Sequence, residues 1–367
     1  MLCIKRSIEN GGLHNESTKE SCSFFGGCSK EYAVSLQSAY AIIKCIDTKK
    51  YVPILIGIAP HSGKWYWYHG ELERIKEDNW QSEENCTPVF PSFDRTVHGL
   101  CYWDNNHLQT ISLDSALPVL HGKNGEDGTV QGVLELMGIP VIGCGLLSSA
   151  LCMDKELAHR IVQMNGIKAA RSFAIKKNYS EKLVQQRALE LGYPLFVKPV
   201  RSGSSFGISK VLYEQDLILA IENAFLHDST VILEEMVDGF EVGCAILGNK
   251  DSDLIVGEVD EIELSDGFFD YTEKYTLKTS SIHVPARISP KKAKEIKGTA
   301  LEIYKALNCC CFARVDMFLT PAGEIYFNEV NTIPGFTEHS RYPNMLKEAG
   351  LPFDEVIGRL IEMGVSK

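Results

Sequence analysis

The sequence predicts a chain of mixed α/β and α+β class, in which an N-terminal parallel-sheet domain precedes two domains of mixed strands and helices. At 367 residues the chain exceeds the usual size of one domain, so two or three units with separate cores are expected. From Phe24 to about Cys144 short apolar runs alternate with helical stretches, a pattern typical of parallel strands covered by helices. The later part of the chain instead shows hairpin patterns, and there is no internal repeat.

The composition is that of a globular enzyme, with 44% apolar and 23% charged residues. The net charge of -11 results from 37 basic and 48 acidic residues, and no stripe of Lys or Arg could follow a phosphate backbone. Nucleic acid is therefore not an expected partner. The longest apolar runs, such as Tyr51 to Ile58, are too short to cross a bilayer, so we expect no membrane span.

Residues 1–22 predict a polar N-terminal extension rather than a secretion signal, because they carry several charges and no apolar core segment. The first strand is expected to end at Ser23 to Phe25, before Gly26 and Gly27. The 12 cysteines are scattered, and the contiguous group from Cys309 to Cys311 lacks the spacing of a zinc site. We therefore predict free thiols in a reducing cytoplasm.

The N-terminal domain is expected to span residues 23–153. Its strands and helices are predicted at Val34 to Ile46, Val52 to Ile58, Ala116 to Leu120, Val130 to Met137 and Val141 to Cys144. Asp154 is placed to cap a helix from Lys155 to Val162, which Gly166 ends. This helix is expected to open a second domain at residue 154.

The second domain, residues 154–237, should contain two strands joined by a Gly and Ser turn, then a helix and another strand. These elements are predicted at Pro194 to Pro199, Gly207 to Leu212, Leu217 to Leu226 and Val231 to Glu234. The third domain, residues 238–367, should contain further strands and two helices, Lys291 to Leu307 and Phe353 to Met363.

A hairpin in the third domain gathers polar side chains that suit a divalent cation. It consists of strands Phe312 to Leu319 and Glu324 to Asn331 around a turn at Thr320 to Gly323. Because side chains two apart share a face, Arg314 lies beside Asp316, and Glu329 lies beside Asn331; symmetric pairing would place all four on one face. Two carboxylates and an amide oxygen suit Mg²⁺, and the arginine could hold a developing anion. The alternative is a charged face that merely meets water.

Three loops add to this prediction. Thr332 to Thr337 follows the hairpin and contains Gly335, whose backbone N–H could meet an oxyanion. Lys198 ends a strand before a Gly and Ser loop that could cradle phosphate oxygens, although an ordinary hairpin turn is the alternative. It is not a Walker loop, because the lysine precedes the glycines. Gly267 to Tyr275 is an aromatic and charged segment that predicts an active-site lid or, alternatively, a partly buried surface loop.

Several short sequence motifs follow one another along the chain. They are Phe25-Gly26-Gly27 with Glu31 and Val34-Ser35-Leu36, His121 to Gly128, Met153-Asp154-Lys155, Phe196 to Pro199 with Gly203-Ser204-Ser205, Glu273-Lys274-Tyr275, Arg314-Val315-Asp316, and Asn328 to Thr332. Together they resemble the D-alanine:D-alanine ligase family of the ATP-grasp fold, from about Phe24 to the C-terminus. The resemblance implies an ATP-grasp fold with an N-terminal Rossmann-like domain. It also implies a homodimer that uses ATP and two Mg²⁺ ions, with Mn²⁺ as a substitute.

The resemblance implies a role for each matching residue. Contacts with ATP are implied for Lys155, Lys198, Glu234 (adenine), Glu241 (ribose) and Lys274 (γ-phosphate). Asp316, Glu329 and Asn331 would hold the two metal ions, and Arg314 with the Gly335 N–H would stabilise the oxyanion. Glu31 would bind the ammonium of the first D-amino acid and, with Ser204 and Tyr275, connect the lid to the site, while His121 would lie near that substrate.

Within the family the chain is most similar to the D-alanine:D-serine ligases of vancomycin-resistant bacteria, because Ser340-Arg341-Tyr342-Pro343 stands where D-alanine:D-alanine enzymes usually have Ser-Leu. The resemblance implies that Ser340 and Arg341 line the second-substrate pocket. A guanidinium there suits a more polar acceptor, whereas a solvated surface arginine is the alternative. The lid phrase Glu273 to Tyr275 disfavours a D-lactate ester, while Ala33 and Glu338 depart from the family pattern.

The sequence therefore predicts ATP-dependent ligation of D-alanine to D-serine through D-alanyl phosphate, giving a modified peptidoglycan precursor and vancomycin resistance. A housekeeping D-alanine:D-alanine ligase is the nearest alternative, with Arg341 incidental. A nucleotide-binding module without catalysis is the alternative from another class. A nicotinamide dehydrogenase, suggested by the turn at Gly26 and Gly27, lacks the three-glycine fingerprint of that class.

Overall fold

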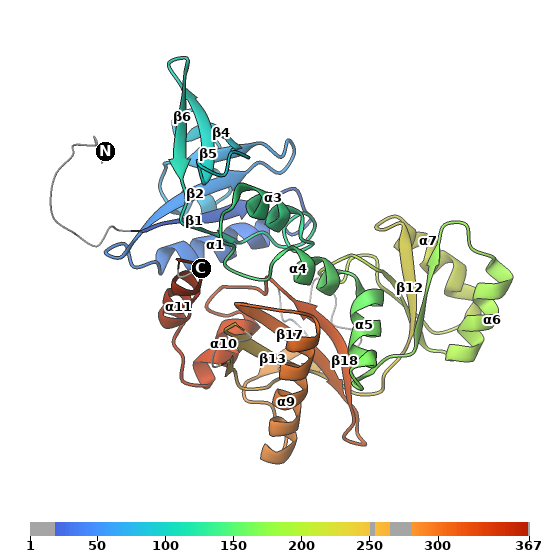
Figure 1. Ribbon diagram of the computed structural model, residues 1–367. Helices are drawn as coiled ribbons and strands as arrows, with labels where there is room; N and C mark the ends of the chain where they lie inside the picture. Colours follow the sequence, from blue (N-terminus) through green and yellow to red (C-terminus); the bar gives the residue numbers. More distant parts are fainter. Residues whose placement is uncertain (1–18, 250–253, 265–279, 366–367) are drawn as a thin grey trace.

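The computed structural model describes residues 19–249, 254–264 and 280–365 (Figure 1). The lid predicted at Gly267 to Tyr275, with Lys274 and Tyr275, lies outside the described residues. The described strands form three sheets: a seven-stranded N-terminal sheet, a four-stranded central sheet and a seven-stranded C-terminal sheet. Each sheet has an apolar cluster of its own, and a further cluster joins the N-terminal domain to the C-terminal one, from Phe25 and Ile42 to Phe312 and Ile357.

The N-terminal sheet has the order β6-β5-β4-β3-β2-β1-β7. Its strands are β1 (Lys19–Gly26), β2 (Tyr51–Ile58), β3 (Trp65–Tyr68), β4 (Cys86–Pro91), β5 (Gly99–Asp104), β6 (His107–Ser112) and β7 (Ser115–Pro118), and its helices are α1 (Tyr32–Lys44), α2 (Glu73–Lys76), α3 (Thr129–Met137) and α4 (Leu146–Met153). Strand β1 pairs in parallel with β2 and β7, which confirms the predicted parallel sheet. Strands β3 to β6 extend it antiparallel, because the short connection from β2 to β3 cannot form a crossover.

Strand β1 begins earlier than the sequence pattern indicated. The predicted extension, residues 1–22, ends inside this strand, because β1 starts at Lys19. Ser21 and Cys22 are buried between β2 and β7. Their polar or small side chains concealed a strand whose backbone is paired on both sides, so the boundary at residue 23 is wrong by four residues. The apolar run from Val141 also forms only an isolated bridge to Ala116.

The central sheet has the order β11-β10-β12-β9 and lies apart from the N-terminal domain (Figure 1). Its elements are β9 (Ser172–Lys176), α6 (Glu181–Leu191), β10 (Leu195–Pro199), β11 (Ser209–Val211), the short 3₁₀ helix Glu214–Asp216, α7 (Leu217–Phe225) and β12 (Thr230–Glu235). The predicted two strands, helix and strand are all present within this unit. Apolar residues of α6 and α7 cover one face of the sheet.

The C-terminal sheet has the order β16-β15-β13-β17-β18-β8, with β14 paired to β13. Its elements are β8 (Lys168–Ala169), β13 (Phe240–Leu247), β14 (Ile255–Val256), β15 (Asp260–Leu264), β16 (Ser280–His283), α9 (Pro290–Ala306), β17 (Phe312–Leu319), β18 (Ile325–Asn331), α10 (Arg341–Glu348) and α11 (Phe353–Val365). The predicted hairpin and both predicted helices are confirmed. Helix α11 packs back against β7 and β1, joining the two ends of the described chain.

Helix α5 (Lys155–Met164) belongs to the C-terminal core rather than the central one. Asp154 caps it as predicted, since Asp154 Oδ1 accepts a hydrogen bond from Leu157 N (3.1 Å). Its apolar residues pack with the core beneath β13 and β17, and the following strand β8 pairs with β18. The domain boundary predicted at residue 154 therefore falls too early. In Figure 1, α5 lies between β18 of the C-terminal sheet and β12 of the central sheet.

The cysteines of the described chain are all free, as predicted. Cys309 and Cys311 are buried in the turn before β17, where Cys309 Sγ lies 3.7 Å from Cys152 Sγ. No helix within residues 19–249, 254–264 and 280–365 is long and apolar enough to cross a membrane.

Candidate active site

A cleft of about 500 Å³ separates the central sheet from the C-terminal sheet. Four of the five predicted nucleotide contacts line it: Lys155, Lys198, Glu234 and Glu241. The fifth, Lys274, lies outside the described residues. The rest of the lining combines apolar side chains such as Phe196, Ile208 and Phe318 with polar groups, which is the usual make-up of a small-molecule site.

Lysines and carboxylates pair at the base of this cleft. Lys198 forms an ion pair with Glu234, and both side chains are buried. Although burial favours the neutral acid, the adjacent Lys198 and His159 hold the pKa of Glu234 below its usual range. Lys155 Nζ donates to Ser202 O (2.9 Å) and lies 3.5 Å from Glu329 Oε2. Lys155 therefore connects the Gly and Ser loop to the predicted metal site.

The hairpin of β17 and β18 places the predicted metal ligands on one face, but through a β-bulge. Arg314 pairs with Asn331 and Asp316 pairs with Glu329, whereas Met317 pairs with Phe327. Asn328 is therefore an extra residue opposite the Asp316–Met317 step. If the register of Met317 with Phe327 continued unbroken, Asp316 would pair with Asn328, and Glu329 and Asn331 would lie on the opposite face. The symmetric pairing assumed from the sequence is wrong, and the bulge produces the common face.

The ligand set around Asp316 fits a hard divalent cation. Asp316 is buried, and Arg314 donates to both its oxygens through Nε and Nη2 (2.8 and 2.7 Å). Asn331 Nδ2 donates to Asp316 Oδ2 (2.8 Å), and turning this amide over would present its oxygen at the same place. Two carboxylates and an amide that share a face next to a cleft are ligands that Mg²⁺ or Mn²⁺ accepts.

Arg341, predicted to bind the second substrate, is neither solvated nor free. Its side chain is 8% exposed and donates to Asp260 through Nε and Nη2 (2.6 and 2.9 Å) and to Glu241 through Nη1 (2.6 Å). Its Nη2 also lies 3.4 Å from Asp316 Oδ1. The alternative of a surface arginine is therefore wrong. Arg341 connects the predicted ribose contact to the predicted metal ligand, and Asp260 is a contact that sequence reasoning missed.

The side predicted to bind the first substrate is built from loops of the N-terminal domain. Glu31, at the start of α1, accepts a hydrogen bond from Ser204 Oγ of the central domain. Added Cβ atoms on Gly122 and Gly203 would collide with the Glu31 carboxylate, so both loops approach it closely. Glu31, Ser204 and Tyr275 were predicted to act together. The structure brings Glu31 and Ser204 into contact, and Tyr275 lies outside the described residues.

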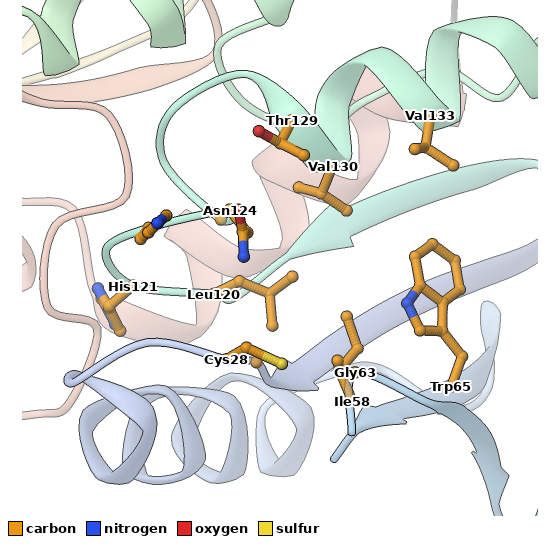
Figure 2. Close-up of a pocket in the computed structure, with 13 residues that line it drawn as sticks. Cys28, Ile58, Gly63, Trp65, Leu120, His121, Asn124, Thr129, Val130 and Val133 are labelled. Atoms are coloured by element: carbon orange, nitrogen blue, oxygen red, sulfur yellow. The ribbon is translucent and has the colours of Figure 1, made fainter. Parts of the chain in front are cut away.

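His121 lies on the loop after β7, at one end of an apolar cavity of about 270 Å³ (Figure 2). The cavity runs past Cys28 and Leu120 towards Trp65. His121 Nε2 is 2.9 Å from Ser38 Oγ, and burial lowers the pKa of His121 to about 4, so the imidazole is neutral near pH 7.

Two side chains of the N-terminal domain hold the loop that contains Gly335. Ile333 N donates to Glu126 Oε1 (3.2 Å), and Phe336 N donates to Ser38 Oγ (3.3 Å). A Cβ on Gly335 would lie 3.0 Å from Ser340 Oγ, which accepts from Thr337 N (3.0 Å) and lies at the start of α10. The predicted oxyanion donor is therefore fixed from both domains.

Glu126 and Ser38 were not predicted as site residues. Glu126 Oε2 also accepts from Gly122 N (2.7 Å), so this buried carboxyl joins the Gly122 loop to the Ile333 loop. Burial and then the neighbouring Glu31 raise the pKa of Glu126 to about 8. The signal for Glu126 in the sequence was its position within the motif His121 to Gly128. The resemblance assigned a role to His121 in this motif but none to Glu126.

Comparison with known proteins agrees with this geometry. Two family models match the chain, "D-ala D-ala ligase N-terminus" over residues 22–144 and "D-ala D-ala ligase C-terminus" over residues 161–362. A Streptomyces coelicolor protein that carries the name of a D-alanine–D-lactate ligase is 46% identical, over 93% of this chain and 96% of its own. The vancomycin C-type resistance protein VanC1 of Enterococcus gallinarum is 42% identical, over 92% and 96%.

Among solved structures, the VanG D-Ala:D-Ser ligase from Enterococcus faecalis superimposes with a TM-score of 0.88. It is 55% identical and covers 95% of this chain and 99% of its own. The fold is therefore the ATP-grasp fold that the sequence predicted. With both family models matched and relatives well above 30% identity along nearly the whole chain, this protein belongs to the D-alanine:D-alanine ligase family.

Proposed function

We propose that this protein ligates D-alanine to D-serine at the expense of ATP, through a D-alanyl phosphate intermediate. The observation that carries the acceptor assignment is Arg341, buried between Asp260 and Asp316 at the start of α10. Asp260 holds Nε and Nη2 of this guanidinium and Glu241 holds one N–H of Nη1, so the second N–H of Nη1 would be the donor to a hydroxyl or carboxylate of the acceptor, which a leucine lacks. The 55% identity to a D-Ala:D-Ser ligase supports the same assignment.

The first half-reaction activates the carboxylate of D-alanine. Lys155 and Lys198, which line the cleft, would neutralise ATP phosphates, and Glu31, which accepts from Ser204, would bind the ammonium of the first substrate. Asp316, Glu329 and Asn331 would hold Mg²⁺, which supplies charge stabilisation on the transferred phosphoryl group when bound. Lys274 and Tyr275 are proposed to close the site and exclude water, as the sequence predicts.

In the second half-reaction the amine of the acceptor attacks the acylphosphate carbonyl. Arg314 and the Gly335 N–H are proposed to stabilise the tetrahedral oxyanion until phosphate leaves. Glu126 and Ser38 support this proposal, because they fix the residues on either side of Gly335. The neutral imidazole of His121 would lie against the first substrate without repelling its ammonium.

Product analysis tests the acceptor. Equal D-alanine and D-serine with ATP near neutral pH should give mainly D-alanyl-D-serine by mass spectrometry. Mainly D-alanyl-D-alanine would instead support the housekeeping ligase, in which Arg341 has no part in selecting the acceptor. The names of the relatives include an ester-forming ligase, so D-lactate belongs in the same panel, and we expect no ester.

A nucleotide-binding module without catalysis predicts ATP binding but no phosphate release when D-amino acids are added. Phosphate release that depends on two D-amino acids would exclude it. By analogy with VanC1, a vancomycin resistance protein, we propose that the product replaces the usual end of a peptidoglycan precursor. The homodimer implied by the resemblance stays a prediction, which light scattering of the purified protein tests.

A further inference from the structure

Helix α5 carries a histidine that no step of the proposed reaction uses. His159 is buried, and its Nε2 lies 3.0 Å from the carbonyl oxygen of Asn328, the extra residue of the bulge in β18. Because a carbonyl oxygen only accepts, this nitrogen carries the proton and donates. The imidazole also packs edge-on against the ring of Phe327, with ring centroids 5.3 Å apart.

The bulge is supported by one face of α5. Lys155 and His159 are four residues apart, so they project from the same side of the helix. Lys155 Nζ lies 3.5 Å from Glu329 Oε2, while His159 bonds the carbonyl of the preceding residue. Two adjacent residues of the bulge are therefore held by adjacent turns of one helix, which Asp154 caps.

The other imidazole nitrogen of His159, Nδ1, makes no hydrogen bond within the described residues. Among the described residues, Nδ1 of His159 and Oε1 of Glu234 are buried atoms without a hydrogen-bond partner, 3.8 Å apart. Burial lowers the pKa of His159, and the nearby Glu234 carboxylate opposes that shift. An apolar residue of the same volume could pack in this place but would offer no donor to the Asn328 carbonyl.

We propose that His159 is a positioning residue for the divalent-metal site, because its Nε2–H holds the Asn328 carbonyl and thereby the register that puts Glu329 and Asn331 beside Asp316. Regular pairing of β18 would turn Glu329 and Asn331 to the opposite face, as the pairing of Met317 with Phe327 shows. The proposal rests on the proposed metal site. It adds that the ligands share a face only while this hydrogen bond persists.

The test is direct binding of Mn²⁺ in the presence of ADP, measured by electron paramagnetic resonance on the full chain. His159→Gln places an N–H close to the former Nε2, whereas His159→Asn reaches only the position of Nδ1. We expect the Asn variant to bind Mn²⁺ about tenfold more weakly than the wild type, as for other groups that orient metal ligands, and the Gln variant to stay within about threefold. His69→Met, which changes a histidine of the N-terminal domain, should leave binding unchanged.

Equal Mn²⁺ affinity in the wild type and the Asn variant would overturn the proposal, as would equal weakening in the Gln and Asn variants. Thermal unfolding in EDTA accompanies each measurement. A merely structural role would lower the melting temperature of both variants without separating their Mn²⁺ affinities. A wild-type protein that binds no Mn²⁺ with ADP would instead contradict the proposed metal site itself, so the two failures are distinguishable.

Discussion

The cleft and the first-substrate side are built in different ways. In the cleft, long charged side chains from strands and α5 meet in ion pairs such as Lys198 with Glu234 and Lys155 with Glu329. On the first-substrate side, loops that follow parallel strands are joined by backbone N–H groups bound to Glu126 and Ser38. The geometry of the cleft depends on strand register and on the balance of charges. The geometry of the predicted first-substrate side depends on how the N-terminal domain docks against the C-terminal domain.

This difference indicates how each region should fail. Removing a charge from the cleft leaves a buried partner unpaired, which costs several kcal/mol. Removing one acceptor from the loops costs a single hydrogen bond, about 1 kcal/mol net, and shifts an N–H by a fraction of an ångström. Changes in the cleft should therefore abolish activity or stability, whereas changes at the loops should reduce the rate.

The largest effect is expected for Asp316→Asn. The change removes a predicted metal ligand and the carboxylate that Arg314 and Arg341 share, so phosphate release with two D-amino acids should fall at least about a thousandfold, or about 4 kcal/mol. Asp94→Asn, in an exposed turn of the N-terminal domain, is the matched control and should keep full activity. Activity within tenfold of the wild type would remove Asp316 from the site.

The second-largest effect is expected on the free energy of unfolding when Arg341 is replaced. Arg341→Leu leaves Asp260, which is fully buried, without its bidentate partner, and should lower the free energy of unfolding in urea by about 3 kcal/mol. Adding Asp260→Asn removes the buried charge and should recover a large part of that loss. The double variant is also the cleaner background for measuring the share of D-serine in the product. If the double variant is no more stable than Arg341→Leu, then Arg341 does not stabilise the protein through its ion pair with Asp260.

A smaller effect is a dependence of stability on pH. The pKa of Glu126, about 8 in the folded protein, lies above its ordinary value of 4.5, so its contribution is fully present below about pH 4.5 and lost as the pH rises through 8. His121 is half protonated in the unfolded state at pH 6.5, but both the wild type and Glu126→Gln contain it, so its contribution cancels in the comparison. The wild type should lose at most about 2 kcal/mol relative to Glu126→Gln over this interval. Parallel melting-temperature curves for the two proteins would contradict this.

The smallest effect is expected for Ser38→Ala. The loss of the acceptor for Phe336 N and of the contact with His121 should lower kcat about fivefold with little change in the KM for ATP. Ser62→Ala, which removes an acceptor from an exposed turn, is the control. A change in the KM for ATP alone would show that the Gly335 loop does not depend on Ser38.

Local patterns predicted much of the fold. The Asp154 cap, the hairpin of β17 and β18 and the parallel strands follow from capping residues, turn residues and apolar periodicity, which act within a few residues. The membership of α5 in the C-terminal core was missed, because the partners of an amphipathic helix are chosen by contacts far away in sequence. Strand β1 was shortened for a similar reason, since Ser21 becomes buried only through β2 and β7.

The predicted metal site shows most clearly what the sequence determined and what the tertiary structure decided. The sequence by itself determined which chemical groups are available: two carboxylates, an amide and an arginine at a spacing of two along two strands. Only the tertiary structure decided that they meet, because a bulge at Asn328 changes which face Glu329 and Asn331 occupy. The break in alternation from Phe327 to Val330 was the sole local sign of it. A strand's face depends on hydrogen bonds from its neighbours, here β17 and His159, and those neighbours are set by the fold.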